Sequence, residues 1–484
     1  MRKYIVAIVL ILFFPIFLSL PIYNDNGAYA YMGTLFFEGK LPYIDGWDHK
    51  GISMYLINAL GYLIGFKHLM GIRLLEFLLI LGSFFSIFKT LSQKYTQKIA
   101  FVAVSFGLLS LRYFFDGGNM TEEYGALFAL ISLSLILKEK IRTMDYIFIG
   151  ILFVVNITIR ANLISFWIAL FLAMIIYAIL KKELLKKVIF PFSKMLIGIG
   201  ISASLLTIYF LMTASFLEFY NAAFTYNFSY AKRSFLQTIG SVITSTRRYE
   251  VSLVMLLGFL IAMVSLVKKR TNFVSLLLFF WVPLELYFGN MSGKLFAHYY
   301  MMWIPIIVLS TAYIIDYFKI ETLQREKKFV ILGIITFLFF QIPIFSTVKS
   351  YKQVFLSKRT QKGSVVSHIN KNYKNASILI WGNSHSTYLL VDKRAVVPYF
   401  FQTFFKVKSD ITKNIMLDFT KRFIQNPPDL LVDAKTPSLL FLDNSNSDEI
   451  NNYQKENLQE YFSFVHQNYK LKETIKGVDF YIKK

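Results

Sequence analysis

The sequence contains no cysteine, and only 17% of its 484 residues are charged. The lack of cysteine excludes disulfides, a thiol nucleophile and zinc–thiolate sites. The low charge, together with 55% hydrophobic residues, excludes an ordinary soluble protein of this length. The sequence also lacks a Walker loop, an HExxH pair and a GxSxG elbow, so the common nucleotide-binding, metalloprotease and serine-hydrolase signatures are absent.

The chain is instead rich in long apolar runs. A helix needs about 20 apolar residues to cross a bilayer. The runs lie near residues 4–22, 51–66, 69–90, 99–115, 124–137, 144–159, 163–180, 188–213, 250–267, 273–288, 299–317 and 329–346. Aromatic residues make up 18% of the chain, with 50 Phe and 30 Tyr, which suits lipid-facing helices with interfacial belts. The sequence therefore predicts a polytopic α-helical membrane protein.

The first apolar run resembles a signal peptide, because the basic residues Arg2 and Lys3 precede it and the small-residue triplet AYA follows it at 28–30. The run is about twenty residues long, whereas the apolar region of a signal peptide has roughly 7–15. We therefore expect a retained first span with its N-terminus in the cytoplasm.

The loops between the apolar runs are of two kinds. One kind is basic, as in KTLSQKYTQK, KEKIR, KKELLKK, KKRTN and KIETLQREKK. The other kind is acidic or mixed and comprises 23–50, 116–123, 160–162, 214–249 and 290–298. Lys and Arg favour the cytoplasmic side of a membrane, so the first kind is predicted inside and the second outside. The formal charge of +23 is thereby assigned to membrane topology and not to nucleic-acid binding.

Segment 51–66 decides the number of spans. If it crossed the membrane, every later loop would change sides and the basic loops would lie outside. The segment is short and contains Asn58 and several glycines, so we expect a helix at the outer interface. This interpretation gives about eleven spans, with the C-terminus outside. A true span compensated by a re-entrant neighbour is the alternative.

The composition changes after residue 346. Four short segments, ASILIWG, RAVVPYF, DLLVD and SLLFL, are typical of buried strands. Two others, SDITKNIMLDFTKRFI and SDEINNYQKENLQEYFSFVHQ, are typical of amphipathic helices with Ser-Asp caps. We therefore expect a transmembrane catalytic domain over 1–346 and an extracytoplasmic α/β domain over 347–484. The α/β domain has an excess of basic residues but no Gly-rich loop or metal cluster, which favours a structural lid over a catalytic role.

Candidate acids lie in the predicted outer loops. Asp25 follows the first span and precedes an aromatic series that suggests a helix along the interface, and Asp48 belongs to the segment LPYIDGWDHKG. Glu122 and Glu123 stand where a helix enters the bilayer, and a carboxylate there is costly unless it faces water, a cation or a substrate. Compensation of the helix dipole and simple interfacial hydration are the alternative explanations. Asp25 and Glu122 are the catalytic candidates.

The predicted outer loops contain few basic residues. Arg160 lies between two apolar runs, where it can either anchor a helix end or bind a phosphate at headgroup depth. A histidine beside two tyrosines, such as His298, can equally be an interfacial packing residue. Several cations converging with carboxylates would indicate a binding site. The residues expected to bind substrate are Asp48, Lys50, Glu123, Arg160, Lys294, His298 and Tyr299.

Taken together, the first span, Asp25 with AYAY, LPYIDGWDHKG and the second acidic segment TEEY resemble the GT-C superfamily of membrane glycosyltransferases. The chain is most similar to the bacterial branch that includes relatives of protein O-mannosyltransferases and lipid A aminoarabinose transferases. AHYYMMWIP resembles the HYY segment of that branch. Two features depart from the pattern. Asp25 is followed by Asn26 where many relatives have Asp-Glu, and Lys50 is followed by Gly-Ile where relatives often have Pro-Pro.

The resemblance implies transfer of a sugar from a polyprenyl-phosphate carrier on the outer face of the plasma membrane, with a separate synthase supplying the lipid-linked donor. It implies a catalytic aspartate in the first outer loop, which matches Asp25. The second acidic site of the family matches Glu122, with Glu123 adjacent. The acceptor would be a cell-envelope glycan, teichoic acid, lipid or protein.

The chemistry of these residues fits such a transfer by itself. Phosphate is a competent leaving group, so the enzyme needs a carboxylate to deprotonate the acceptor hydroxyl and cationic donors for the departing phosphate. Direct attack on C1 opposite the phosphate predicts inversion at that carbon. Protein cations can hold a monophosphate, so we expect no metal or other cofactor. Chelation of Mg²⁺ by Glu122 and Asp116 is the alternative.

Two other functions compete with this interpretation. A polymerase or ligase of lipid-linked glycans would use the same outer carboxylates and cations. A carrier flippase or transporter would need charged residues near the middle of the membrane and repeated halves, and the sequence shows neither.

Overall fold

The computed structural model describes residues 1–17, 20, 25–183, 185–230, 233–320, 348, 361–443, 445–446 and 449–484. The chain forms two compact units. Unit 1 comprises Met1–Leu20, Ile64–Tyr209 and Ala231–Phe355, and unit 2 comprises Pro21–Leu63, Phe210–Tyr230 and Leu356–Lys484. The predicted boundary between residues 346 and 347 lies outside the described residues, so the division into 1–346 and 347–484 stays a prediction.

All regular secondary structure in the described part of unit 1 is helical. The predicted apolar runs of this unit each fall on a helix, except the run at 329–346, which lies outside the described residues. The helices are α1 (Arg2–Phe17), α4 (Met70–Lys94), α5 (Gln97–Phe114), α6 (Thr121–Ile136), α7 (Thr143–Ile159), η2 (Ala161–Ile164), α8 (Ser165–Lys181), η3 (Leu185–Ile189), α9 (Phe190–Thr213), α12 (Phe235–Arg248), α13 (Ser252–Val267), α14 (Phe273–Asn290), η5 (Ala297–Tyr300) and α15 (Trp303–Tyr317).

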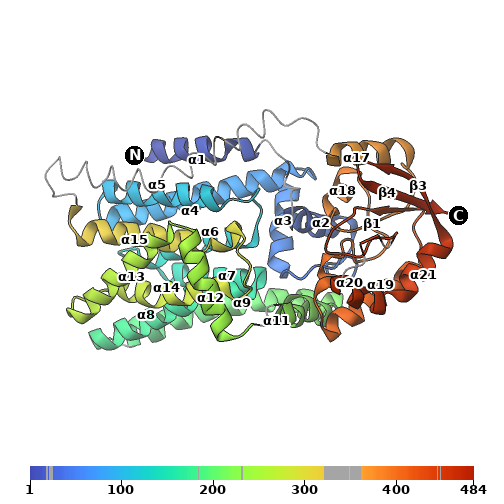
Figure 1. Cartoon of the computed structure of the whole chain (residues 1–484). Coiled ribbons are helices and arrows are strands. Elements are labelled where there is room, and N and C mark those ends of the chain that lie inside the picture. The colour runs from blue at the N-terminus through green and yellow to red at the C-terminus, as the bar shows by residue number, and fades with distance from the viewer. Residues whose placement is uncertain are drawn as a thin grey trace. The chain divides into compact units, whose positions relative to one another are not determined.

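Local sequence signals set several of these helix ends. The hydroxyl of Thr96 accepts a hydrogen bond from the amide of Ile99 at the start of α5. Asn272 and Ser275 form a reciprocal capping box at the start of α14. Helices α4, α5, α6 and α15 then pack side by side (Figure 1). The polar loop residues therefore act as helix stops, and the apolar faces make the core.

By length and composition, four described helices can cross a membrane: Met70–Lys94, Ala161–Lys181, Lys187–Thr213 and Phe273–Asn290. A fifth span results if α12 and α13, bent by 112°, count as one. The predicted total of about eleven spans stays a prediction. The segment 214–249, predicted as an outer loop between spans, is largely helical in its described part, and its placement on the outer side stays a prediction. Its helices are α10 (Phe216–Tyr220), η4 (Asn221–Thr225), α11 (Tyr226–Tyr230) and α12.

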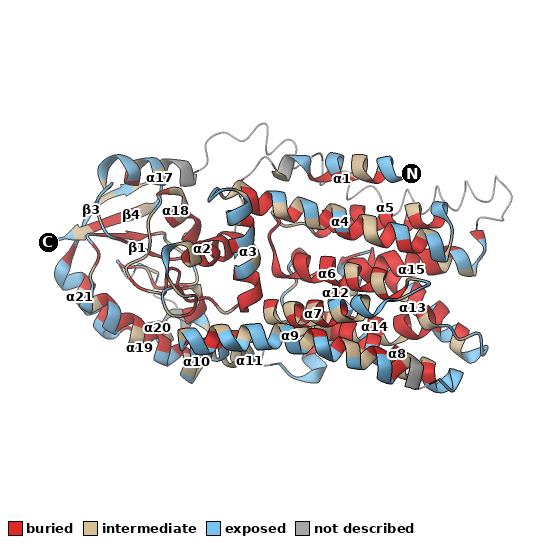
Figure 2. Cartoon of the chain, turned by 180° about the vertical axis from the view of Figure 1, so that it is seen from behind, coloured by how far each residue is buried: buried red, intermediate tan, exposed pale blue. Residues whose placement is uncertain are grey.

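Helix α9 leaves most of its surface uncovered by the rest of the chain (Figure 2). Its exposed side chains include Ile197, Ile201, Leu205 and Ile208, which recur at intervals of three or four residues and so share one face. An apolar stripe of this length would promote aggregation in water but is what contact with lipid requires. The exposed face of α9 thus agrees with a membrane-embedded helix.

Two glycines let α7 and α9 approach closely. A Cβ atom on Gly150 would lie 2.1 Å from the carbonyl oxygen of Met195, and one on Gly198 would lie 1.9 Å from the carbonyl oxygen of Ile147. Both distances are far below contact, and the obstructing atoms belong to backbone. Small residues at such crossings let helix backbones pack against each other within a bilayer. The α7–α9 crossing therefore depends on the absence of a side chain at both positions.

We expect Gly198→Ala to lower the free energy of unfolding by about 2 kcal/mol or more, because the added methyl group forces the two helices apart. Gly200→Ala in the same helix is the matched control, since a Cβ there meets nothing within 4 Å. The control should be neutral or slightly stabilising, because alanine favours helix over glycine. The measurement is apparent melting temperature of the full chain in detergent. Equal melting temperatures for the two variants would contradict the close crossing.

Unit 2 combines helices from three parts of the chain with one sheet. Its helices are α2 (Asp25–Leu35), η1 (Phe36–Glu38), α3 (Ile52–Ile64), α10, η4, α11, α17 (Gln361–Asn372), α18 (His385–Leu390), η7 (Thr403–Lys406), α19 (Asp410–Gln425), α20 (Glu449–Asn457) and α21 (Gln459–Asn468). The sheet has the order β1-β2-β4-β3, with β1 and β2 parallel and the other neighbours antiparallel. Its strands are β1 (Ile378–Trp381), β2 (Leu430–Asp433), β3 (Tyr469–Ile475) and β4 (Val478–Lys483).

The strand predictions have mixed outcomes. ASILIWG and DLLVD contain β1 and β2. RAVVPYF and SLLFL are not strands: the first makes only one isolated bridge, between Ala395 and Ile378, and the second forms a buried loop. A short apolar run does not distinguish a buried strand from a buried loop. The C-terminal hairpin β3–β4 was missed because β3 is an edge strand rich in charged, exposed residues.

The two predicted amphipathic helices are present, with one difference. The hydroxyl of Ser409 caps α19 as expected, accepting a hydrogen bond from the amide of Thr412. The second predicted helix is interrupted at Leu458 and forms α20 and α21. The predicted helix after Asp25 is also present as α2. Its residues Tyr29 and Tyr31 are buried inside unit 2, and its position relative to a membrane interface stays a prediction.

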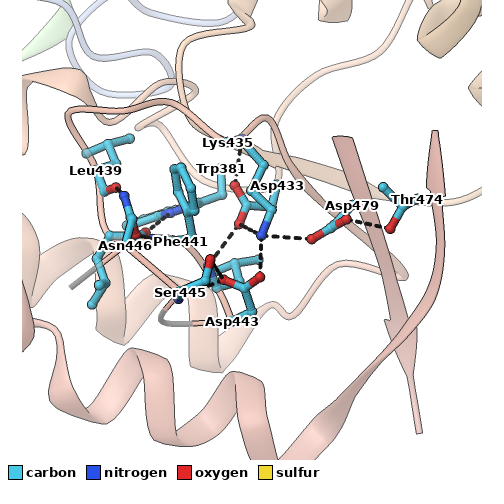
Figure 3. Close-up of polar contacts among 12 residues, drawn as sticks. Trp381, Asp433, Lys435, Leu439, Phe441, Asp443, Ser445, Asn446, Thr474 and Asp479 are labelled. Atoms are coloured by element: carbon cyan, nitrogen blue, oxygen red, sulfur yellow. Dashed lines mark hydrogen bonds and ion pairs between the residues drawn. The ribbon is translucent and has the colours of Figure 1, made fainter. Parts of the chain in front are cut away.

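A polar cluster closes the end of β2 (Figure 3). The ammonium of Lys435 lies 2.7 Å from Asp443, 2.8 Å from Asp479 and 3.6 Å from Asp433. Asp433 also accepts backbone hydrogen bonds from Lys435 and Leu442. Burial raises the pKa of Asp433 to about 6. Because these contacts join β2, β4 and the buried loop after β2, we interpret the cluster as structural.

Candidate active site

The candidate residues of unit 2 lie on α2 and on the loop that follows it. Asp25 is the first residue of α2, and its side chain is exposed, whereas the rest of the helix is buried. Helix α2 packs closely on both sides, since a Cβ on Gly27 would meet His385 of α18 at 3.1 Å and one on Gly33 would meet Asn58 of α3 at 2.6 Å. Helix α2 is therefore held in place by its neighbours and presents one exposed carboxylate, that of Asp25.

Three consecutive charged or titratable residues end the loop. Asp48 and Lys50 are buried, with 1% and 8% of their surfaces exposed. The Nδ1 atom of His49 lies 3.2 Å from Asp48 Oδ1, and its Nε2 atom lies 2.8 Å from Lys50 Nζ. The ammonium also lies 5.6 Å from the centre of the Tyr29 ring. Asp48, His49 and Lys50 thus form one connected polar chain that ends in a cation.

The pKa shifts of Asp48 and His49 are consistent with the geometry of these three residues. Burial and the neighbouring Lys50 lower the pKa of His49, against smaller opposing contributions from Asp48 and Asp25. His49 is therefore neutral near pH 7, and its Nε2 can accept a hydrogen bond from the ammonium of Lys50. Although burial alone would raise the pKa of Asp48, Lys50 and the contacts with His49 hold it well below its usual range. Asp48 is therefore ionised and balances the charge of Lys50.

Hydrogen bonds to the backbone fix the loop in place. The hydroxyls of Tyr43 and Tyr55 lie 2.8 and 3.1 Å from the carbonyl oxygen of Lys50. The Tyr55 hydroxyl also lies 3.0 Å from Asp48 Oδ2. The side-chain amide of Asn227 in α11 donates to the carbonyl oxygen of His49 at 2.7 Å. Lys50 is consequently positioned by its own backbone as well as by its side-chain partners.

In unit 1, the predicted residues around Arg160 are brought together. Arg160 lies between α7 and η2 and forms an ion pair with Glu122 at the start of α6. The guanidinium lies 4.6 Å from the centre of the Tyr299 ring, and the Tyr299 ring packs against His298 at 4.8 Å. Glu122 also accepts a hydrogen bond from the hydroxyl of Thr121 at 2.7 Å. These residues come from three separate segments and form one polar patch.

The remaining predicted residues of unit 1 occupy different environments. Nδ1 of His298 lies 3.1 Å from Asp116 Oδ2, which joins the second acidic loop to η5. Glu123 is fully buried and reaches back towards the amide of Met120. Lys294 is exposed, and its backbone amide donates to Ser292. Glu123 therefore has a structural setting, while His298 lies in the patch with Arg160.

An ion pair that sequence reasoning missed supports the second acidic loop. Arg73 and Glu76 in α4 are 1% and 0% exposed and lie 2.7 Å apart. Arg73 donates to the carbonyl oxygen of Gly117 at 2.8 Å, and Glu76 accepts from the amide of Asn119 at 3.0 Å. Gly118 lies between them with φ of +74°, where a Cβ would lie 2.1 Å from Glu76. A charged i, i+3 pair inside the apolar run 69–90 was the available signal.

Within the described ranges, no three histidine, aspartate or glutamate side chains are grouped to hold a metal ion. The predicted absence of a metal cofactor stays a prediction.

We expect Arg73→Met to lower the free energy of unfolding by about 3–5 kcal/mol, because it leaves the carboxylate of Glu76 buried without its cation. The double variant Arg73→Met/Glu76→Met should recover part of this loss, because both charges are then removed. The measurement is apparent melting temperature in detergent. If Arg73→Met is as stable as the wild type, the pair does not stabilise the loop. The same follows if the double variant loses the sum of the stabilities lost in the two single variants.

Comparison with known proteins identifies similar folds among solved structures but no relative by sequence. No protein-family model matches the chain, and no curated protein matches it by sequence. Among solved structures, ArnT from Cupriavidus metallidurans bound to undecaprenyl phosphate matches with a TM-score of 0.62 and 13% identity, over 99% of this chain and 98% of ArnT. The apo form of the same protein matches with a TM-score of 0.61.

The oligosaccharyltransferase of Archaeoglobus fulgidus, tethered with an acceptor peptide, is a second similar structure. It matches with a TM-score of 0.53 and 11% identity, over 89% of this chain and 68% of that protein. ArnT and this oligosaccharyltransferase both belong to the GT-C superfamily. The GT-C fold that the sequence resemblance implied is therefore confirmed for nearly the whole chain, as the fold of a helical membrane protein.

Proposed function

We propose, on the premise of a GT-C fold, that this chain transfers a sugar from a polyprenyl-phosphate donor to an acceptor of the cell envelope. The observation that carries the proposal is the buried ammonium of Lys50, fixed by Asp48 and His49 next to a short helix with an exposed acid at its start. A cation held in this way can bind a phosphate without further reorganisation. Similarity to a protein with bound undecaprenyl phosphate supports the donor class.

The proposed reaction is a direct displacement. The acceptor hydroxyl gives its proton to Asp25, and its oxygen attacks C1 of the sugar. The bond between C1 and the phosphate oxygen breaks, and the polyprenyl phosphate leaves with both electrons. Lys50 stabilises the negative charge of the leaving phosphate, as a hydrogen-bond donor with a positive charge. Attack opposite the leaving group inverts the configuration at C1.

The environments of the three acids favour Asp25 as the base. Asp48 is buried and engaged with Tyr55, and its lowered pKa makes it a weak base. Glu122 is occupied by Arg160 and Thr121. Asp25 is exposed at the first turn of α2. We therefore assign proton abstraction to Asp25, and assign to Glu122 the orientation of Arg160.

The other predicted residues receive secondary roles. Within unit 1, the patch of Arg160, His298 and Tyr299 is proposed to bind substrate through its own cation and rings. Lys294 is exposed and is proposed to meet the acceptor or the lipid headgroups. We further propose that the reaction is metal-independent and occurs on the outer face of the plasma membrane, with a cytoplasmic N-terminus and a separate synthase supplying the donor.

A polymerase or ligase of lipid-linked glycans is the second candidate, because the fold is also similar to that of an oligosaccharyltransferase. A donor assay separates the two functions. Consumption of a lipid-monophosphate sugar with transfer of a single residue supports the first, and consumption of a lipid-diphosphate oligosaccharide supports the second. Vectorial movement of a lipid carrier without transfer would indicate a flippase.

We expect Asp25→Asn to reduce the rate of sugar transfer by about 10²–10⁴-fold, because the amide cannot accept the acceptor's proton. Its melting temperature should stay within a few degrees of the wild type, since the side chain is exposed. Asp45→Asn is the matched control, because Asp45 is an exposed acid of the following loop whose carboxylate accepts only a local bond from the Leu41 amide. Full activity of Asp25→Asn would reassign the base to Asp45, Asp48 or Glu122, and loss of activity in Asp45→Asn would single out Asp45.

A further inference from the structure

Unit 2 contains a groove of about 560 Å³ beside the loop that carries Lys50. This volume is within the range of ligand sites in proteins. All of its lining residues belong to unit 2. They come from the loop 41–47, from α10 and η4, from the segment before η7, and from α19. They are Tyr43, Ile44, Trp47, Glu218, Asn221, Thr225, Pro398, Tyr399, Ile411, Asn414, Ile415, Asp418 and Arg422.

One wall of the groove is aromatic and rigid. Trp47 packs against the ring of Phe404 at 4.2 Å, and its amide donates to the carbonyl oxygen of Pro398 at 2.9 Å. Tyr399 lies 6.3 Å from the Trp47 ring, and the hydroxyl of Tyr43 is held by the carbonyl oxygen of Lys50. These rings are held by neighbours on several sides, so a ligand would meet a preformed surface.

The other walls combine polar and apolar side chains, with Ile411 and Ile415 of α19 beside the polar groups. Asn414, Asp418 and Arg422 follow one another at intervals of four residues and share one face of α19. Asp418 accepts hydrogen bonds of 2.7 Å from both the Tyr399 hydroxyl and Arg422 Nε. Across the groove, α10 and η4 contribute an acid, an amide and a hydroxyl, which are Glu218, Asn221 and Thr225.

We propose that this groove binds sugar units of the acceptor, and thus that the acceptor is a glycan. This inference rests on the proposed glycosyl transfer. Aromatic rings cover the apolar faces of sugars, and planar amide, carboxylate and guanidinium groups pair with neighbouring hydroxyls. Two acids against one cation disfavour a polyanion, and an acyl chain would leave the charged and amide groups of the groove without partners. A glycan seated here lies against Trp47, the residue directly before Asp48.

A polypeptide acceptor fits the groove less well. Extended peptides commonly pair with an exposed strand edge, and the elements that line this groove are helices and loops. The polar lining groups are side chains that come from α10, η4 and α19, so they can meet hydroxyls from different directions. The groove is therefore better suited to a sugar, whose hydroxyls project all around the ring.

Glycan binding can be measured with the full chain in detergent on an array of bacterial envelope oligosaccharides, with a peptide library as the second probe. We expect the wild type to bind one or more neutral or weakly charged glycans. Asn414→Ala and Arg422→Ala should each weaken this binding by about three- to tenfold, because each removes hydrogen bonds to the sugar. Lys421→Ala is the matched control, because Lys421 is an exposed cation next to Arg422 that does not line the groove.

Three results would overturn the proposal: no glycan bound by the wild type, equal binding by the groove variants and the control, or preferential binding of peptides lost in the groove variants. Stabilisation of each protein by undecaprenyl phosphate is measured in parallel. It should be unchanged in the groove variants, because the groove does not include Lys50. Glycan binding in a wild-type protein that undecaprenyl phosphate does not stabilise would support the groove but contradict the proposed function.

Discussion

The candidate residues of each unit depend on buried charges that have an opposite charge nearby. Moving an isolated ion into a low-dielectric interior costs several kcal/mol, and only a close opposite charge with further hydrogen bonds offsets this cost. In each case one partner sits at the end of a helix or in the loop next to it, so the pairs also fix the loops. In unit 2 the charges are those of Asp48 and Lys50, joined through His49, and in unit 1 the ion pairs are Glu122–Arg160 and Arg73–Glu76.

The consequence for chemistry is a set of preorganised groups. Lys50 lies against His49, whose pKa is lowered by burial, and Asp48, whose pKa is held below its usual range, supplies the opposite charge. Arg160 is directed by Glu122 and by the ring of Tyr299. Groups that are already oriented lose little free energy when a phosphate arrives. The loop that holds Lys50 also supplies one wall of the groove, so a single rigid segment can serve both the donor and the acceptor.

Much of this arrangement follows from the sequence, because helix-length apolar runs and the charges at their ends are local patterns. The helices of unit 1 and the polar segment with Asp48 and Lys50 were predictable on that basis. The support from Arg73 and Glu76 was not, since the pair is hidden inside an apolar run and its function depends on a contact with residues some 40 positions away. The apolar segments RAVVPYF and SLLFL were misjudged because burial alone does not select a strand.

The central claim is that Lys50 is a preorganised ligand for the donor's phosphate. The most direct test is the dissociation constant of undecaprenyl phosphate for Lys50→Gln, with Lys40→Gln as control, because Lys40 is a partly exposed lysine near the start of the same loop. We expect Lys50→Gln to bind at least about tenfold more weakly, which is the loss of one charged hydrogen bond, and the control to bind as the wild type does. Unchanged affinity in a folded Lys50→Gln protein would contradict the claim.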